Sequence, residues 1–131
     1  MTNSLKIERV PGLYAVARLA ADAAIPDWID GPGFQSISRS DDELTLVCRQ
    51  DRVPSNVEVE RDWCCIRTIG PFPFEAAGIV TSLIAPLSDS GISVFVICTF
   101  DGEHVLIPAR KAELAIDCLR AADHSVAAWE T

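Results

Sequence analysis

Short apolar or alternating segments in the first half of the chain predict four strands. These segments cover residues 13–19, 34–39, 43–48 and, more briefly, 57–60. Only a Ser-Asp-Asp turn separates the second segment from the third, so we expect these two to form an antiparallel hairpin. Residues 20–33 are rich in proline and glycine, which predicts a loop with one short helical turn around its tryptophan.

After residue 70 the spacing of apolar residues changes to a helical period. Residues 63–69 are one more strand-like segment, which ends at Gly70-Pro71. We expect Pro86 either to kink the following helix or to be tolerated in its last turn, and the helix to stop at Gly91. Its apolar stripe follows the spacing i, i+1, i+4, i+5 and i+8, with Ile79, Val80, Leu83, Ile84 and Leu87.

The remainder of the chain predicts two more strands, a second helix and a short terminal strand. Residues 92–100 are the most hydrophobic stretch, which we interpret as a central strand, and a tight turn leads into a strand over residues 103–108. Residues 125–129 suit a last edge strand. Between them we expect a helix over residues 111–122, whose inner side carries Leu114, Ile116 and Leu119.

The order of these elements predicts the fold class. From residue 61 the order is βαββαβ, the ferredoxin-like pattern, with an antiparallel sheet and both helices on one face. The first half repeats the order β, loop, β, β, turn, β, as if the same unit had lost its helices. We therefore predict an α+β protein of two tandem units, a reduced one over residues 1–60 and a complete one over residues 61–131.

Composition narrows the class of partner. Of the 131 residues, 49% are hydrophobic, which excludes a disordered chain. The net charge of −8 argues against nucleic-acid binding, because the densest basic cluster is only Arg110-Lys111. No apolar run is long enough to span a membrane, and the first residues do not resemble a signal peptide. We expect a cytoplasmic protein with neither nucleic acid nor membrane as partner.

The cysteines and histidines predict neither a metal site nor a cofactor. The five cysteines lack C-x-x-C spacing and histidine partners, so we expect reduced thiols, mostly buried. His124 follows a predicted helix, where a cation would suit the helix dipole. Cys98 and His104, across the predicted hairpin, are the one pair that could form a nucleophile and base; no phosphate loop or dinucleotide motif is present.

Three motifs of the second half resemble a group of ACT-domain proteins, small bacterial proteins of two tandem ACT-like units. The motifs are Gly78-Ile79-Val80 at a helix start, Ile97-Cys98-Thr99-Phe100 at a strand end, and the acidic turn and strand over residues 101–108. Residues 34–39 and 42–48 supply a supporting match. Relatives of this group include the regulatory domains of aspartate kinases and cytosolic arginine sensors. Two residues depart from the family pattern, Cys98 in place of serine and Glu103 in place of aspartate.

The resemblance implies a non-catalytic sensor or regulatory protein that binds an amino acid between the two ACT-like units, without a cofactor. It would act through a regulated protein or a second copy of the chain. Free N–H groups at the start of the Gly78 helix suit the ligand's carboxylate, and the acidic turn suits its cationic groups. The implied ligand-binding residues are Gly78, Ile79, Val80, Thr99, Phe100, Asp101 and Glu103, faced by Ser36, Ile37 and Ser38.

Each of these residues also has a purely structural interpretation. Gly78 suits close packing of helix and sheet, Asp101 suits a turn, and Glu103 suits a solvated strand edge. Ile79 and Val80 suit a core, and Thr99 suits a strand. Two other functions therefore stay open: an interaction domain with a vestigial pocket, and a small enzyme that uses Cys98 and His104.

Overall fold

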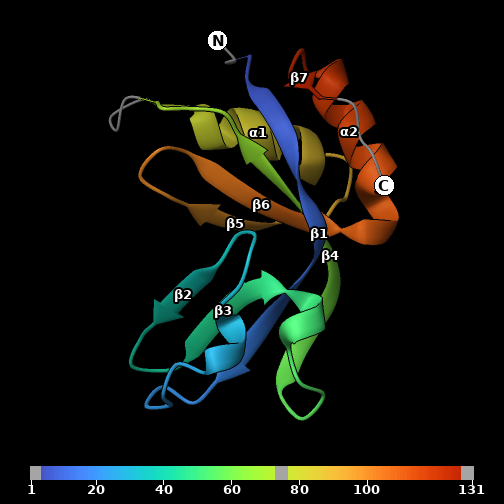
Figure 1. The fold of residues 1–131 in the computed structure, drawn as a ribbon. Helices are drawn as coiled ribbons and strands as arrows, with labels where there is room; N and C mark the ends of the chain where they lie inside the picture. The colour runs from blue at the N-terminus through green and yellow to red at the C-terminus, as the bar shows by residue number, and fades with distance from the viewer. Residues whose placement is uncertain (1–3, 73–76, 128–131) are drawn as a thin grey trace. The chain divides into compact units, whose positions relative to one another are not determined.

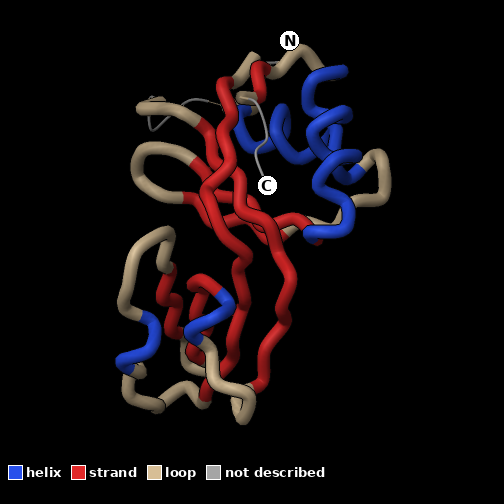
Figure 2. The backbone as a smooth tube through the Cα atoms, turned by 45° about the vertical axis from the view of Figure 1, so that its right-hand side comes forward, coloured by secondary structure: helices blue, strands red, loops and turns tan. Residues whose placement is uncertain are grey.

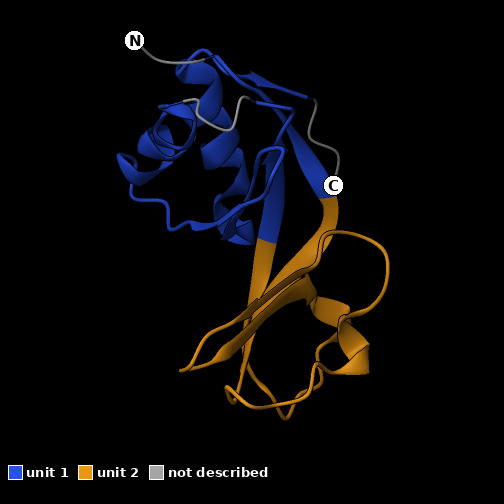
Figure 3. Ribbon diagram, turned by 90° about the vertical axis from the view of Figure 1, so that its left-hand side faces the viewer, with its two compact units in different colours: residues 1–10, 64–131 blue, residues 11–63 orange. Residues whose placement is uncertain are grey.

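The computed structural model describes residues 4–72 and 77–127, which belong to two compact units (Figure 1, Figure 3). Unit 1 contains residues 1–10 and 64–131, and unit 2 contains residues 11–63. Two strands, β1 (Lys6–Leu19) and β4 (Glu58–Thr68), contribute residues to both units. The chain therefore begins unit 1, builds all of unit 2, and returns to complete unit 1.

Unit 2 is built on the predicted hairpin. Strands β2 (Ser36–Arg39) and β3 (Leu44–Arg49) pair antiparallel, and β3 also pairs antiparallel with β1. The 3₁₀-helix η1 (Asp27–Ile29) confirms the predicted helical turn, and a second, η2 (Gln50–Arg52), follows β3. The buried core of this unit consists of Ala15, Ala17, Ile29, Leu44, Leu46, Cys48 and Val53.

Both long strands continue past residues that we expected to end them. The prediction of a strand over 13–19 is too short, because β1 passes through Pro11-Gly12. The two segments predicted at 57–60 and 63–69 are one strand, β4. Gly12 has a φ of 98° and Asp62 a φ of 67°, and a single residue with positive φ can bend a strand without ending it.

Unit 1 has the predicted order of elements (Figure 2). After β4 come α1 (Ile79–Ser88), β5 (Phe95–Cys98), β6 (Glu103–Pro108), the 3₁₀-helix η3 (Ala109–Lys111), α2 (Ala112–Ala121) and β7 (Ser125–Val126). The strand order is β1-β4-β6-β5, with β7 parallel to β1, and the two α-helices contact each other. Residues 128 and 129 of the predicted last strand lie outside the described residues.

Two predictions about unit 1 are wrong. The strand β5 is an edge strand rather than a central one: among the described strands it pairs with β6 alone, and its side chains are at best half-buried. The neighbouring strand β6 is the buried one, because it lies between β4 and β5. In α2, Leu114 is 46% exposed; the side chains that face the interior are Ala112, Ala115, Ile116 and Leu119.

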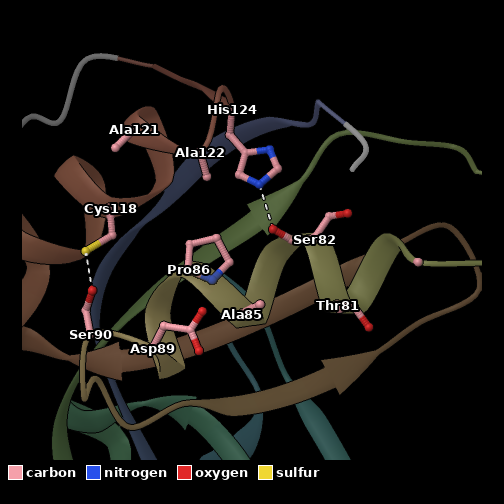
Figure 4. A pocket seen from close by; sticks show the side chains of 11 residues that line it. Thr81, Ser82, Ala85, Pro86, Asp89, Ser90, Cys118, Ala121, Ala122 and His124 are labelled. Carbon is pink, nitrogen blue, oxygen red and sulfur yellow. Dashed lines mark hydrogen bonds between the residues drawn. The ribbon is translucent and has the colours of Figure 1, made fainter. Parts of the chain in front are cut away.

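His124 completes the hydrogen bonding of α1 at its proline. Pro86 has no N–H, so the carbonyl of Ser82, four residues earlier, lacks its helical donor. The Nε2–H of His124 supplies that donor at 2.7 Å (Figure 4), while its Nδ1 accepts the N–H of Leu5 at 3.0 Å. Because Nδ1 accepts a hydrogen bond, this buried imidazole is neutral, and our expectation of a cation at the helix end is wrong.

Candidate functional site

One cavity in unit 1 gathers the seven candidate residues of the second half. It has a volume of about 270 Å³ and lies between the start of α1 and the β5–β6 turn. The candidates that line it are Gly78, Ile79, Val80, Thr99, Phe100, Asp101 and Glu103. Among the described residues, Phe72, Thr81, Cys98 and Gly102 also line it. Residues from two separate segments, 72–81 and 98–103, thus line one small cavity.

The start of α1 brings backbone N–H groups that have no acceptor within the helix to the edge of this cavity. The first helical hydrogen bond runs from the Ser82 N–H to the Gly78 carbonyl, so the N–H groups just before Ser82 have no acceptor within the helix. Gly78 has a φ of 83° and no side chain to cap them. This left-handed conformation explains why glycine is favoured there. The helix start therefore combines free donors with the positive end of the helix dipole, a combination that suits an anion.

Glu103 is buried, so its interpretation as a solvated edge charge is wrong. Only 8% of the residue is exposed. The Thr68 hydroxyl donates to Glu103 Oε2 at 3.0 Å and accepts the Glu103 N–H at 3.0 Å, which fixes the carboxylate. No cation pairs with this carboxylate among residues 4–72 and 77–127. A buried carboxylate without a counter-charge is destabilising, and a cationic ligand would relieve that cost.

The β5–β6 turn is closed by Thr99. Its N–H donates to the Gly102 carbonyl at 2.7 Å and its hydroxyl donates to the same oxygen at 3.0 Å. The Thr99 hydroxyl oxygen keeps lone pairs that can accept from a ligand. Asp101 is exposed at the tip of this turn, and Phe100 is 81% exposed. Thr68 went unnoticed in the sequence because nothing local distinguishes it; only strand pairing brings it to Glu103.

The remaining candidates differ in exposure. Val80 is 38% exposed and Ile79 is half-buried, so both border the cavity and neither is fully in the core. Ser36, Ile37 and Ser38 lie on β2 in unit 2, where the first is half-buried and the other two are exposed.

The register of the β5–β6 hairpin separates Cys98 from His104. Cys98 lies opposite Glu103, while His104 lies opposite Ile97. Adjacent residues of a strand point to opposite faces, so Cys98 and His104 cannot form a nucleophile–base pair. Burial, together with the charge of Arg67, lowers the pKa of His104 from its usual value.

The five cysteines fall into two classes. Burial raises the pKa of Cys48 and Cys64, and it raises the pKa of Cys65 to about 12. Cys98 is exposed and Cys118 is half-buried, so the expectation of buried thiols is confirmed for Cys48, Cys64 and Cys65 and is wrong for the other two. In the described part of the chain, no group of three or more histidine, cysteine or acidic residues could hold a metal ion. No described helix is long and apolar enough to cross a membrane.

This division predicts selective alkylation. In the native protein at pH 8, iodoacetamide should modify Cys98 first and Cys118 second, because access and thiolate formation favour exposed thiols. Peptide mass spectrometry would follow each site. Protection of Cys48, Cys64 and Cys65 should disappear in denaturant; equal rates at all five sites in the native protein would contradict their burial.

Comparison with known proteins identifies the family. A protein of known crystal structure from Agobacterium tumefaciens is 45% identical, over 99% of this chain and 97% of its own, with a TM-score of 0.93. A family profile described as an ACT domain matches residues 58–121, and another, described as an N-terminal domain, matches residues 12–56. The chain belongs to the ACT-domain family. The resemblance inferred from its sequence is confirmed.

Two further structures share the fold of this ACT-domain protein. A Vibrio cholerae protein of unknown function, described as a possible transport protein, matches with a TM-score of 0.74 and 22% identity over 92% of this chain and 91% of its own. Aspartate kinase from Clostridium acetobutylicum, described as an allosteric enzyme, matches with a TM-score of 0.67 and 13% identity over 93% of this chain and 35% of its own. A sequence comparison with curated proteins gives no significant match.

Proposed function

We propose that this ACT-domain protein is a non-catalytic sensor or regulatory protein whose ligand is an amino acid. The observation that carries the proposal is the cavity of about 270 Å³, which combines a helix start suited to an anion with a buried carboxylate that has no cationic partner among the described residues. An amino acid carries a carboxylate and an ammonium group a short distance apart. These two groups would match the two ends of the cavity.

The ligand's groups have complementary partners in unit 1. Its carboxylate would bind the N–H groups that follow Gly78. Its ammonium group would bind Glu103, the Thr99 oxygen and the Phe100 carbonyl, and a longer cationic side chain would reach Asp101. Val80 and Ile79 would contact the apolar part of the ligand.

The wider arrangement is part of the same proposal. We assign residues 1–60 and 61–131 to two tandem ACT-like units in the cytoplasm, with the ligand between them and with Ser36, Ile37 and Ser38 on its other side. Binding that favours one packing of such units over another would supply a regulatory signal, passed to a second copy or to a partner protein. Alanine substitution of Ser36 and Ser38 would test whether these serines contact the ligand.

The test is binding of the proteinogenic amino acids, measured by thermal shift and then by calorimetry. At least one amino acid should raise the melting temperature of the protein. Glu103→Gln should weaken binding of that amino acid about tenfold or more, because the substitution removes the charge and keeps the shape.

Glu113→Gln is the matched control. Glu113 is exposed in the first turn of α2 and lies outside the cavity lining, so its substitution should leave affinity unchanged. A flat thermal response to every amino acid would contradict the proposal. Equal affinity of wild type and Glu103→Gln would contradict the placement of the ligand.

A further inference from the structure

A second, larger cavity lies along the groove between α1 and α2. Its volume is about 500 Å³, within the range of about 300–1,000 Å³ that is typical of small-molecule sites. Figure 4 shows Ala85 and Pro86 on one side and Ala121 and Ala122 on the other. These short side chains leave the groove unfilled, and they give it apolar walls.

One end of this groove carries a single formal charge. Asp89 follows the last turn of α1 and lines the cavity. None of the described lining residues is a lysine or arginine, and His124 is neutral because its Nδ1 accepts the Leu5 N–H. The one lysine close in space, Lys111, donates instead to the Gly91 carbonyl at 3.2 Å. Within residues 4–72 and 77–127, Asp89 has no ion pair.

The position of Asp89 is itself unfavourable for an anion. The C-terminal end of a helix is the negative end of its dipole, so a carboxylate there is destabilised and a cation beside it is stabilised. Ser90 adds a neutral polar group, whose oxygen accepts the Cys118 S–H at 3.2 Å. An apolar groove that ends in an exposed carboxylate, with no ion pair among the described residues, and in a hydroxyl is complementary to an organic cation with an apolar body.

We propose that the α1–α2 groove binds a small amphiphilic amine, with its ammonium group at Asp89 and its apolar body between Ala85, Pro86 and Ala122. This site is separate from the amino-acid cavity, although Gly78 and Thr81 line both. An amine in the groove contacts the same helix whose first turn would hold the amino acid, which gives a second ligand a route to modulate the first.

Three aromatic probes of similar size test the proposal by calorimetry: 2-phenylethylamine, 2-phenylethanol and 3-phenylpropionate. The amine should bind about tenfold more tightly than the alcohol, and the carboxylate should bind more weakly than either. Equal affinity for the amine and the alcohol would overturn the proposal, and so would no binding of the amine at about 10 mM, a concentration tenfold above a Kd of about 1 mM.

Matched variants locate the amine. Asp89→Asn should lower the affinity for the amine about tenfold and leave the affinity for the alcohol unchanged. Asp117→Asn, at an exposed α2 position outside the lining, should change neither affinity. Ala85→Leu should narrow the groove and lower the affinity for all three probes. Loss of amine affinity in Asp117→Asn equal to that in Asp89→Asn would refute the assignment. Glu103→Gln should not affect amine binding, so failure of either proposed site is distinguishable from failure of the other.

Discussion

Replacing His124 with alanine should destabilise unit 1 by about 3 kcal/mol, because the buried N–H of Leu5 loses its acceptor and the Ser82 carbonyl loses the hydrogen bond from the imidazole. Each orphaned group costs on the order of 1–3 kcal/mol. Urea denaturation monitored by circular dichroism would measure the loss. A change below roughly 1 kcal/mol would show that these two hydrogen bonds contribute little.

Pro86→Ala provides an internal control for this prediction. The introduced alanine would supply the N–H that the Ser82 carbonyl lacks, so the helix could satisfy its own hydrogen bonding. The penalty of His124→Ala should then be about 1 kcal/mol smaller in the Pro86→Ala background than in the wild type. Identical penalties in the two backgrounds would mean that His124 does not compensate for the proline.

Replacing Gly70 with alanine should cost about 2 kcal/mol or more and should deform the amino-acid cavity. A Cβ at Gly70 would overlap the backbone oxygen of Asp101, and backbone atoms cannot rotate away as a side chain can. The β5–β6 turn would have to move. Thermal denaturation would report the destabilisation, and the amino-acid affinity would report displacement of the turn.

Gly91→Ala separates strain from steric overlap. Gly91 has a φ of 75°, but nothing lies within 4 Å of the added Cβ. Its cost should be only about 1 kcal/mol, the usual penalty of a left-handed alanine, with no effect on the cavity. If Gly91→Ala destabilised the protein as much as Gly70→Ala, the close approach of Asp101 would not be the cause.

The helical elements were predictable from the sequence because their signals are local. The apolar stripe from Ile79 to Leu87 predicts α1 within one residue of its observed end, and Gly91 marks the following turn. Pro86 did not end the helix, because His124, far along the chain, replaces its missing N–H. No local pattern could show that compensation.

Strand positions and burial were less predictable, because they depend on neighbours in the sheet. The apolar run over residues 92–100 suggests a central strand, yet β6 takes that place. The same limit applies to the candidate site. Motifs brought Gly78, Thr99 and Glu103 to attention, but only the pairing of β4 with β6 reveals that Thr68 holds the carboxylate.

The interrupted path of unit 1 has a consequence for the order in which the protein matures on the ribosome. Leu5 and His124 are hydrogen-bonded across a separation of 119 residues. All residues of unit 2 are synthesised by position 63, which at typical translation rates is roughly 3 to 12 s before His124 is added. Unit 2 can therefore fold co-translationally, while the first residues of β1 wait as an unpaired strand edge. During that interval this edge is open to pairing with another copy, which the net charge of −8 on each chain opposes by repulsion.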